Sequence, residues 1–201
     1  MTKIEGNYLE VGPDVGHFTK LIAETGNIDK AWLYEPNVNT HALLRGAAAG
    51  VEVLISTEME NFARVPDGSL SLAALIHVLD HVIEPKKTLT ELRAKMRPGG
   101  AILMVTHDEQ SMLARTLGRR WPPYCLQHPH LFNTNTTKIL LEKCGFEGVR
   151  TKKSLNFFPL GHLIRHLFNV FGMNPSMAPQ IPIQIPLKLG NLMTVAFAGQ
   201  S

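Results

Sequence analysis

The sequence has few cysteines, no long uninterrupted apolar run and, beyond residue 147, no acidic residue. Only Cys125 and Cys144 occur among 201 residues, at a spacing that matches no zinc or redox motif, so neither a disulfide framework nor a cysteine metal site is expected. Because no stretch of about 18 or more apolar residues is present, no membrane insertion is expected. The first residues lack the basic-then-apolar pattern of a signal peptide, and we therefore expect a cytoplasmic protein.

Charge is also scarce, and it is unevenly distributed. A charged content of 18% with an apolar content of 44% suits one globular domain rather than a disordered chain or a coiled coil. Residues 1–147 hold all 17 acids against 15 lysines and arginines, whereas residues 148–201 hold five basic residues and no acid. A basic tail can attract an anionic ligand, but five charges over this length do not form a nucleic-acid-binding stripe, so no nucleic-acid partner is expected.

Short apolar runs alternate with segments of helical spacing over the first two thirds of the chain. Strands are predicted at Tyr8–Val11, Ala31–Tyr34, Val51–Ile55, Leu70–Ile76, Ala101–Thr106, Val149–Asn156 and Leu192–Ala198. Helices are predicted around 15–22, 39–49, 89–96 and 136–144, and Arg97–Gly100 is predicted as a turn. This alternation indicates an α/β fold with a mostly parallel sheet and helices on both faces, so ligands should bind at the carboxyl ends of the strands.

Two segments differ from this pattern. Residues 113–134 are predicted as a loop rich in aromatics and proline, preceded by a helix near Glu109 with Asp108 as its N-cap. The segment between the last two strands carries five of the 13 prolines, and residues 163–171 within it are predicted as a helix with one apolar face. We interpret the chain as a single domain, 1–201, with 113–135 as an acceptor-side loop and 157–188 as a lid insertion.

The stretch YLEVGPDVGHF, residues 8–18, joins the first strand to the first helix through a glycine turn. A dinucleotide fingerprint would need a third glycine, and a pyrophosphate would be repelled by Asp14, so NAD is disfavoured. Glu35 ends the second strand, where an acid can accept hydrogen bonds from two ribose hydroxyls. Together the turn, Asp14 and Glu35 favour an adenosine that carries a charged sulfur.

These residues resemble the class I S-adenosylmethionine-dependent methyltransferases, specifically the small-molecule subgroup with a type 11 or type 23 domain. The resemblance runs from about residue 7 to the C-terminus through YLEVGPDVGHF, LYEPN, VPDGSLSLAALIHVLDHVIEPKKTLTELRAKMRPGGAILMVT and HPHLFNTNTTKILLEKCGF. It implies a Rossmann-like, doubly wound, seven-stranded sheet with an antiparallel last strand. It also implies methyl transfer from S-adenosyl-L-methionine to a small-molecule acceptor, with S-adenosyl-L-homocysteine as product.

The resemblance also assigns a cofactor site, residue by residue. Glu10, Gly12 and Gly16 would shape the turn around the methionine part, Glu35 with Pro36 beside it would hold the ribose, Glu58 and Met59 would meet the adenine, and His77 and Val78 would face the sulfonium and its methyl group. Asp14 stands where the family usually has a second glycine. Relatives usually carry an N-terminal helical segment over the cofactor, whereas this chain starts close to its first strand, so weaker cofactor binding is expected.

Methyl transfer from a sulfonium needs alignment and a dry site more than catalytic groups, but an oxygen or nitrogen acceptor benefits from a general base. His130 in the HPHLF loop and His77 at the end of the fourth predicted strand are the candidate bases, and His107 and Asp108 also reach the edge of the pocket. No metal site is expected, because His77 and His81 lack a third ligand.

Several alternatives remain at the level of sequence. The chain could be a non-catalytic S-adenosylmethionine-binding or scaffold protein of the same fold or, less in keeping with its glycines, a nicotinamide-dependent dehydrogenase. The acid-free second half favours an anionic acceptor, for which Lys152, Lys153 and Arg165 are candidate contacts. The methylated atom and the oligomeric state are not encoded in any motif.

Overall fold

The computed structural model describes most of the chain. The described residues are 4–59, 62–154, 156–161, 164, 165, 168, 172–177, 179, 181, 183–187 and 190–200. The strands are β1 (Glu5–Val11), β2 (Asn27–Tyr34), β3 (Glu52–Ser56), β4 (Leu70–Ile76), β5 (Met96–His107), β6 (Phe146–Lys153), β7 (Asn156–Pro159), β8 (Gln184–Leu187) and β9 (Asn191–Ala198). The α-helices are α1 (His17–Thr25), α2 (His41–Ala47), α3 (Pro85–Lys95), α4 (Met112–Leu117) and α5 (Thr134–Lys143). Short 3₁₀ turns are η1 (Val38–Thr40), η2 (Leu79–His81), η3 (Gly118–Arg120) and η4 (Pro175–Met177).

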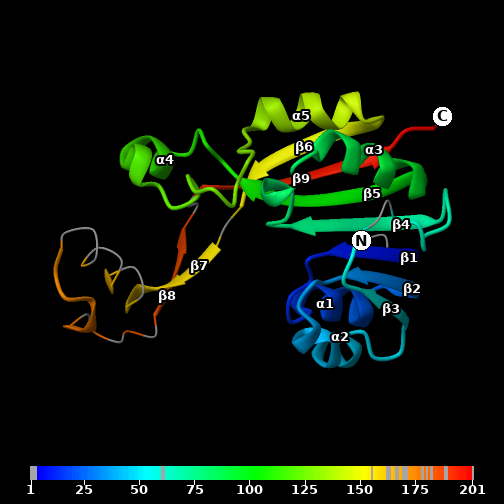
Figure 1. Ribbon diagram of the computed structural model, residues 1–201, viewed down its shortest axis with the longest axis horizontal. Helices are drawn as coiled ribbons and strands as arrows, with labels where there is room; N and C mark the ends of the chain where they lie inside the picture. Colours follow the sequence, from blue (N-terminus) through cyan, green and yellow to red (C-terminus); the bar gives the residue numbers. More distant parts are fainter. Residues whose placement is uncertain are drawn as a thin grey trace.

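Seven strands form one sheet in the order β3-β2-β1-β4-β5-β9-β6. The pairs among β1 to β5 are parallel, and β9 is antiparallel to both β5 and β6. The Rossmann-like fold with an antiparallel last strand is therefore confirmed. We call the edge where β1 to β6 end the carboxyl edge; the arrowheads of β1, β4, β5 and β6 point to it at the left of Figure 1.

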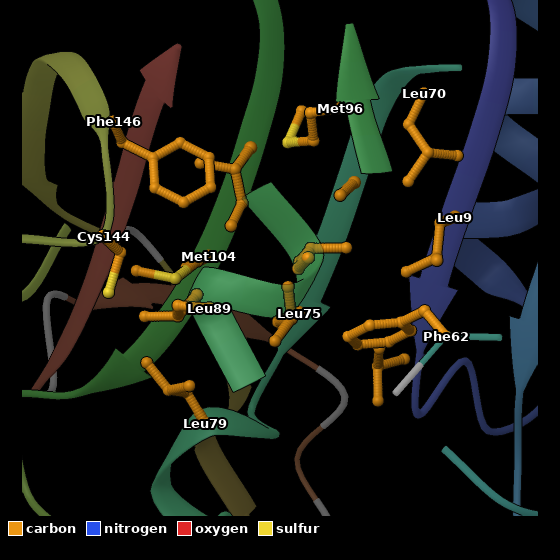
Figure 2. Packing of buried hydrophobic residues seen from close by; sticks show 14 of the residues in the cluster. Leu9, Phe62, Leu70, Leu75, Leu79, Leu89, Met96, Met104, Cys144 and Phe146 are labelled. Carbon is orange, nitrogen blue, oxygen red and sulfur yellow. The ribbon is translucent and has the colours of Figure 1, made fainter. Parts of the chain in front are cut away.

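Hydrophobic clusters on both faces hold the helices to the sheet. Alternate residues of β4 feed the two clusters: Leu72 and Ala74 pack with residues of α1 and α2, and Ala73 and Leu75 pack on the opposite side. This second, larger cluster takes in the buried faces of α3 and α5 (Figure 2). Because β4 is buried on both sides, its continuous apolar run correctly predicts a central strand.

Two helices have clear local signals. Pro85 is the first residue of α3, where its fixed φ favours a helix start, and the helix buries Leu89 and Leu92. Asn133 caps α5: its side chain accepts from the N–H of Thr136, whose hydroxyl bonds back to the N–H of Asn133. These signals fix the residues at which α3 and α5 begin.

Several predicted boundaries are wrong. The turn at 97–100 is a bulge inside β5, since Met96 already pairs with Leu70. The strand predicted at 149–156 starts earlier, as β6, because a register shift around Gly148 lets that residue join the strand with a φ of +61°. Asp108 does not cap a helix. Ser111 caps α4 instead, because its hydroxyl accepts a hydrogen bond from the N–H of Ala114.

The insertion between β6 and β9 contains the β7–β8 hairpin, which pairs as a separate antiparallel sheet. Figure 1 shows this hairpin projecting from the carboxyl edge, on the same side as α4. The predicted lid helix at 163–171 lies largely outside the described residues, although 164, 165 and 168 are helical. Within the described part of the chain, no helix is long and apolar enough to cross a membrane.

Candidate functional site

The glycine turn between β1 and α1 lies at the carboxyl edge and has left-handed backbone at three residues. The φ angle is +65° at Gly12, +52° at Asp14 and +84° at Gly16. A Cβ atom on Gly12 would lie 2.7 Å from Cγ2 of Val78, so the turn packs directly against the segment that follows β4. Gly16 precedes α1 and offers no side chain to cap it. The turn therefore presents main chain to a ligand, including the N–H groups of the first helical turn.

Asp14 fits the position where the family usually has glycine. Left-handed backbone is easiest for glycine, and aspartate and asparagine adopt it more readily than other residues. The Asp14 N–H donates to Oε2 of Glu35 at 2.9 Å, while the Asp14 side chain is exposed. This hydrogen bond joins the glycine turn to the end of β2.

Glu35 is a buried carboxylate, 7% exposed, that is oriented by main-chain donors. Oε1 accepts from the N–H of Asn37 at 2.8 Å, and Oε2 accepts from Asp14. Since a carboxylate oxygen can accept two hydrogen bonds, each oxygen keeps capacity for a hydroxyl group. These two acceptor oxygens match the two hydroxyl donors of a ribose.

Glu10 lies beneath the turn and ties β1 to α1. Its carboxylate, 2% exposed, accepts from the hydroxyls of Tyr8 at 2.7 Å and Thr19 at 2.6 Å, both through Oε2. Burial raises the pKa of Glu10, and the two hydrogen bonds oppose that effect. Burial and the nearby Glu10 carboxylate raise the pKa of Tyr8, which stays protonated. Glu10 therefore positions the turn through α1.

The remaining predicted cofactor residues lie along the same edge. Pro36 is exposed directly after Glu35, and Glu58 is exposed in the segment after β3, where its main-chain oxygen accepts from the Ser56 hydroxyl at 3.1 Å. Met59 is half-buried and packs against the larger hydrophobic cluster. Their contacts with adenine and ribose remain predictions.

Four histidines gather where β4 and β5 end. Ring centroids are 5.1 Å apart for His77 and His107, 4.9 Å for His107 and His128, and 4.5 Å for His81 and His128. Asp80, fully buried, accepts through Oδ2 from the main-chain N–H of His107 at 3.2 Å and from its Nδ1 at 3.0 Å. The cluster therefore joins residues of β5, the segment after β4 and the loop after η3.

His77 has a constrained backbone and an unsatisfied ring. Its φ is +55°, and its N–H donates to the carbonyl of Val105 in β5. Its Nδ1 and Oδ1 of Asp80 are both buried, without a hydrogen-bond partner among the described residues. Burial lowers the pKa of His77, His107 lowers it further, and Asp80 opposes both effects. His77 is therefore neutral at pH 7.

Main-chain carbonyls fix the loop histidines. Nε2 of His130 lies 2.9 Å from the carbonyl oxygen of Ile83, and Nδ1 of His128 lies 2.8 Å from that of Pro123. Because a carbonyl only accepts, the bonded nitrogen carries the proton in each ring. Neutral His130 thus keeps Nδ1 as its basic nitrogen.

One contact of the cluster was not predicted. The sequence places His107 and Asp108 at the pocket edge, and the structure adds a hydrogen bond between His107 and Asp80. The carboxylate of Asp108 instead accepts from a main-chain N–H within its own turn. Parallel pairing of β4 with β5 brings Asp80 and His107 together, and no local pattern encodes this contact. His81 bonds through Nδ1 to the carbonyl of Gln127.

A surface hollow of about 600 Å³ lies elsewhere, over the exposed side of α3. Its lining residues are Glu84, Pro85, Lys86, Lys87, Thr90 and Glu91. None of the predicted site residues lines it. We do not assign the hollow to the site because it borders one helix and none of the strand ends.

Solved structures with the same fold are similar at low sequence identity. An S-adenosylmethionine-dependent methyltransferase from Thermotoga maritima is 19% identical, with a TM-score of 0.61, over 96% of this chain and 82% of that one. One from Archaeoglobus fulgidus is 18% identical, with a TM-score of 0.65, over 97% and 87%. Phosphoethanolamine N-methyltransferase 2 of Haemonchus contortus, in complex with phosphomonomethylethanolamine and S-adenosylhomocysteine, is 13% identical, with a TM-score of 0.62, over 100% and 50%. These likenesses show the fold.

The family follows from the sequence match. No curated protein matches the chain. A family model described as a methyltransferase domain matches residues 2–151, well over half of the chain. Its match covers the glycine turn, Glu35 and the histidines that follow β4 and β5. The chain therefore belongs to the methyltransferase-domain family of class I S-adenosylmethionine-dependent methyltransferases, and S-adenosylmethionine is its cofactor.

Proposed function

We propose that this protein transfers a methyl group from S-adenosylmethionine to a small-molecule acceptor in the cytoplasm. The observation that carries the proposal is the geometry of Glu35. Its buried carboxylate is oriented by the N–H groups of Asp14 and Asn37, so the acid and the glycine turn form one rigid unit at the carboxyl edge. Ligands of open α/β sheets bind at this edge.

Individual residues would hold different parts of the cofactor. The cofactor supplies a methyl group already activated by the positive sulfur, so the protein's task is alignment and exclusion of water. The main chain from Gly12 to Gly16 would hold the methionine part, with Glu10 beneath it, and Glu35 would accept from the ribose. Further along the edge, Pro36, Glu58 and Met59 would border the nucleoside, and His77 and Val78 would face the methyl group.

His130 is the proposed general base. An oxygen or nitrogen acceptor loses a proton as its new bond to the methyl carbon forms, and a nearby imidazole can take that proton. The hydrogen bond between Nε2 of His130 and the Ile83 carbonyl leaves Nδ1 as the atom that takes it. His77 is proposed to line the transfer side, at the end of β4.

An anionic acceptor is favoured by the charge of the C-terminal part. Lys152 and Lys153 are exposed at the end of β6, at the carboxyl edge, and Arg165 is exposed in the insertion. One protein of the same fold was solved with phosphomonomethylethanolamine, a phosphorylated small molecule. A carboxylate or phosphate on the acceptor would be attracted to these three cations.

Calorimetric titration of the purified chain with S-adenosylhomocysteine and, separately, with NADH tests the cofactor site. We expect micromolar binding of the first and none of the second, and at least a tenfold loss of affinity in Glu35→Ala. Glu52→Ala is the matched control, because Glu52 is an exposed acid on β3. Circular dichroism of each variant distinguishes lost binding from lost folding.

The same titration separates the rival functions. Absence of S-adenosylhomocysteine binding would overturn the proposal, and NADH binding would favour a dehydrogenase. If S-adenosylhomocysteine binds, methyl transfer from labelled S-adenosylmethionine to a panel of carboxylate and phosphate acceptors is the next measurement. Binding without any transfer would favour the non-catalytic alternative.

A further inference from the structure

The histidine cluster contains three residues whose ligand atoms converge. Nitrogen or oxygen atoms of His77, Asp80 and His107 all lie within 4.8 Å of one another. The sequence alone argues against a metal because His77 and His81 lack a third ligand. The folded chain changes this conclusion. Because β4 pairs with β5, His107 at the end of β5 lies beside His77, which directly follows β4.

Two of the three residues have buried polar atoms that lack a hydrogen-bond partner. Nδ1 of His77 and Oδ1 of Asp80 are shielded from solvent, and neither has a hydrogen-bond partner among the described residues. Burying such atoms unpaired is unfavourable, so an unpaired group in a native structure calls for a ligand or another explanation. A cation beside both atoms would satisfy them, and it would replace the proton that Nδ1 of His107 shares with Asp80.

We propose that His77, Asp80 and His107 form a binding site for a divalent transition-metal ion, with Zn²⁺ as the probe. Two imidazoles and one carboxylate form a donor set that suits zinc, whereas magnesium and calcium prefer oxygen ligands. Three protein ligands leave at least one position of a four-coordinate ion open. This arrangement is found in catalytic rather than structural zinc sites. The proposed site shares His77 with the methyl-transfer side described above, and the test below measures Zn²⁺ binding without the cofactor.

The surroundings of the three residues hold them in place. The main-chain N–H of His107 donates to Oδ2 of Asp80, which orients the carboxylate. The ring of His107 also packs edge-on against Trp121, which is 2% exposed, at a centroid distance of 6.2 Å. Hydrogen bonds and packing of this kind around metal ligands fix their orientation.

Calorimetric titration of chelator-treated full-length protein with Zn²⁺ tests the site, using His77→Asn and His107→Gln. Asparagine is chosen for position 77 because it tolerates the left-handed backbone there. His41→Gln is the matched control, since His41 bonds to the Glu35 carbonyl and is not one of the three residues. We expect one Zn²⁺ per chain, a dissociation constant that rises at least tenfold in both cluster variants, and no change in the control.

Zinc X-ray absorption on the loaded protein provides a second readout. We expect nitrogen and oxygen ligands at about 2.0–2.1 Å and no sulfur at about 2.3 Å, which excludes the exposed Cys125 as a ligand. Three results would each overturn the proposal: no Zn²⁺ binding at about 100 μM, an unchanged affinity for Zn²⁺ in His77→Asn, or a sulfur ligand. If His107→Gln fails to fold by circular dichroism, His77→Asn decides the outcome.

Discussion

At the scale of single residues, Asp14 adopts the left-handed backbone that a glycine would adopt in this turn, and its N–H donates to Glu35. The left-handed conformation costs a residue with a side chain roughly 1–2 kcal/mol more than it costs glycine. Aspartate is among the residues that adopt this conformation most readily, and the bond from its N–H to Glu35 is one that a glycine would also make. The aspartate therefore keeps the main-chain connection between the turn and the end of β2.

Gly12 is constrained by a neighbour as well as by its backbone angle, and the two constraints can be separated. Gly12→Ala would place Cβ 2.7 Å from Val78 Cγ2, whereas Gly50→Ala has a similar positive φ but open space around it. We expect both variants to lose about 1–2 kcal/mol of unfolding free energy from backbone strain. Only Gly12→Ala should also lose S-adenosylhomocysteine affinity, by at least tenfold in a calorimetric titration. Equal affinities in the two variants would contradict the placement of the turn.

The buried Glu10 predicts a pH-dependent stability. Because burial raises the pKa of Glu10, the folded state binds its proton more tightly than the unfolded state, whose glutamates titrate near about 4.3. The stabilising contribution is full below that pH and is lost as pH rises through the folded pKa. Glu10→Gln does not titrate, so its unfolding free energy relative to the native chain should rise from about pH 4 upward.

Urea unfolding of both proteins at a series of pH values measures this difference. Glu5→Gln removes an exposed carboxylate from the start of the same strand and serves as the control. A difference between the native chain and Glu10→Gln that stays constant with pH would contradict the raised pKa.

The site residues differ in how far the sequence could predict them. The glycine turn and Glu35 are local features of strand ends, and the structure places them together as expected from a parallel sheet. The contact between Asp80 and His107 depends on the register of β4 against β5, which residue spacing does not reveal.

At the scale of secondary-structure elements, β6 and β9 pair on either side of the insertion. Lys153 pairs with Leu192, and the Ser154 N–H donates to the Asn191 carbonyl at 2.8 Å, so the chain leaves and re-enters the sheet at adjacent positions. The β7–β8 hairpin between them pairs only with itself among the described strands. The insertion is therefore separable from the seven-stranded sheet.

Replacing residues 156–189 by a short glycine-asparagine turn tests this separation. We expect the shortened chain to keep its far-ultraviolet circular dichroism per ordered residue and to bind S-adenosylhomocysteine within about threefold of the full chain, since a shorter loop costs little closure entropy. Methyl transfer to an acceptor of the full chain should be lost, because the predicted lid is removed. Retained transfer would contradict the lid, and lost folding would contradict the separation.

The sequence predicted central elements better than peripheral ones. β4 is buried on both faces, so its apolar run identifies it without ambiguity. The β7–β8 hairpin was not predicted because proline, here Pro159 and Pro186, usually interrupts strands. Both strands of a two-stranded sheet are edge strands, and proline is compatible with an edge strand. The start of β6 was missed because Gly148 there resembles a loop residue.

At the scale of the whole molecule, the two hydrophobic clusters hold the fold together, and the carboxyl edge carries the predicted site residues. Both faces of the sheet are covered by helices that pack on buried side chains, which leaves the strand ends as the place where polar groups converge. The turn and Glu35 lie on the β1–β2 side of this edge, and the histidine cluster lies on the β4–β5 side. The residues proposed to hold the cofactor and the histidine cluster are therefore adjacent by topology.

The uneven charge of the chain should affect the KM of an anionic acceptor. Lys152, Lys153 and Arg165 are exposed in the acid-free C-terminal part, so changing all three to glutamine should raise the KM of a carboxylate or phosphate acceptor about tenfold and leave kcat nearly unchanged. The native protein's kcat/KM should fall as salt is raised, because the Debye length shortens to about 8 Å at 0.15 M, and the triple variant should lose most of that dependence.

A control variant removes the same charge elsewhere. Lys20, Lys87 and Lys138 each pair with a glutamate on the surface of α1, α3 or α5, and changing these three to glutamine leaves the basic tail intact. If the field of the C-terminal part attracts the acceptor, this control keeps the native KM and salt dependence. Equal effects of the two triple variants would show that net charge alone is responsible, and an unchanged KM in the first variant would rule out an anionic acceptor held by these cations.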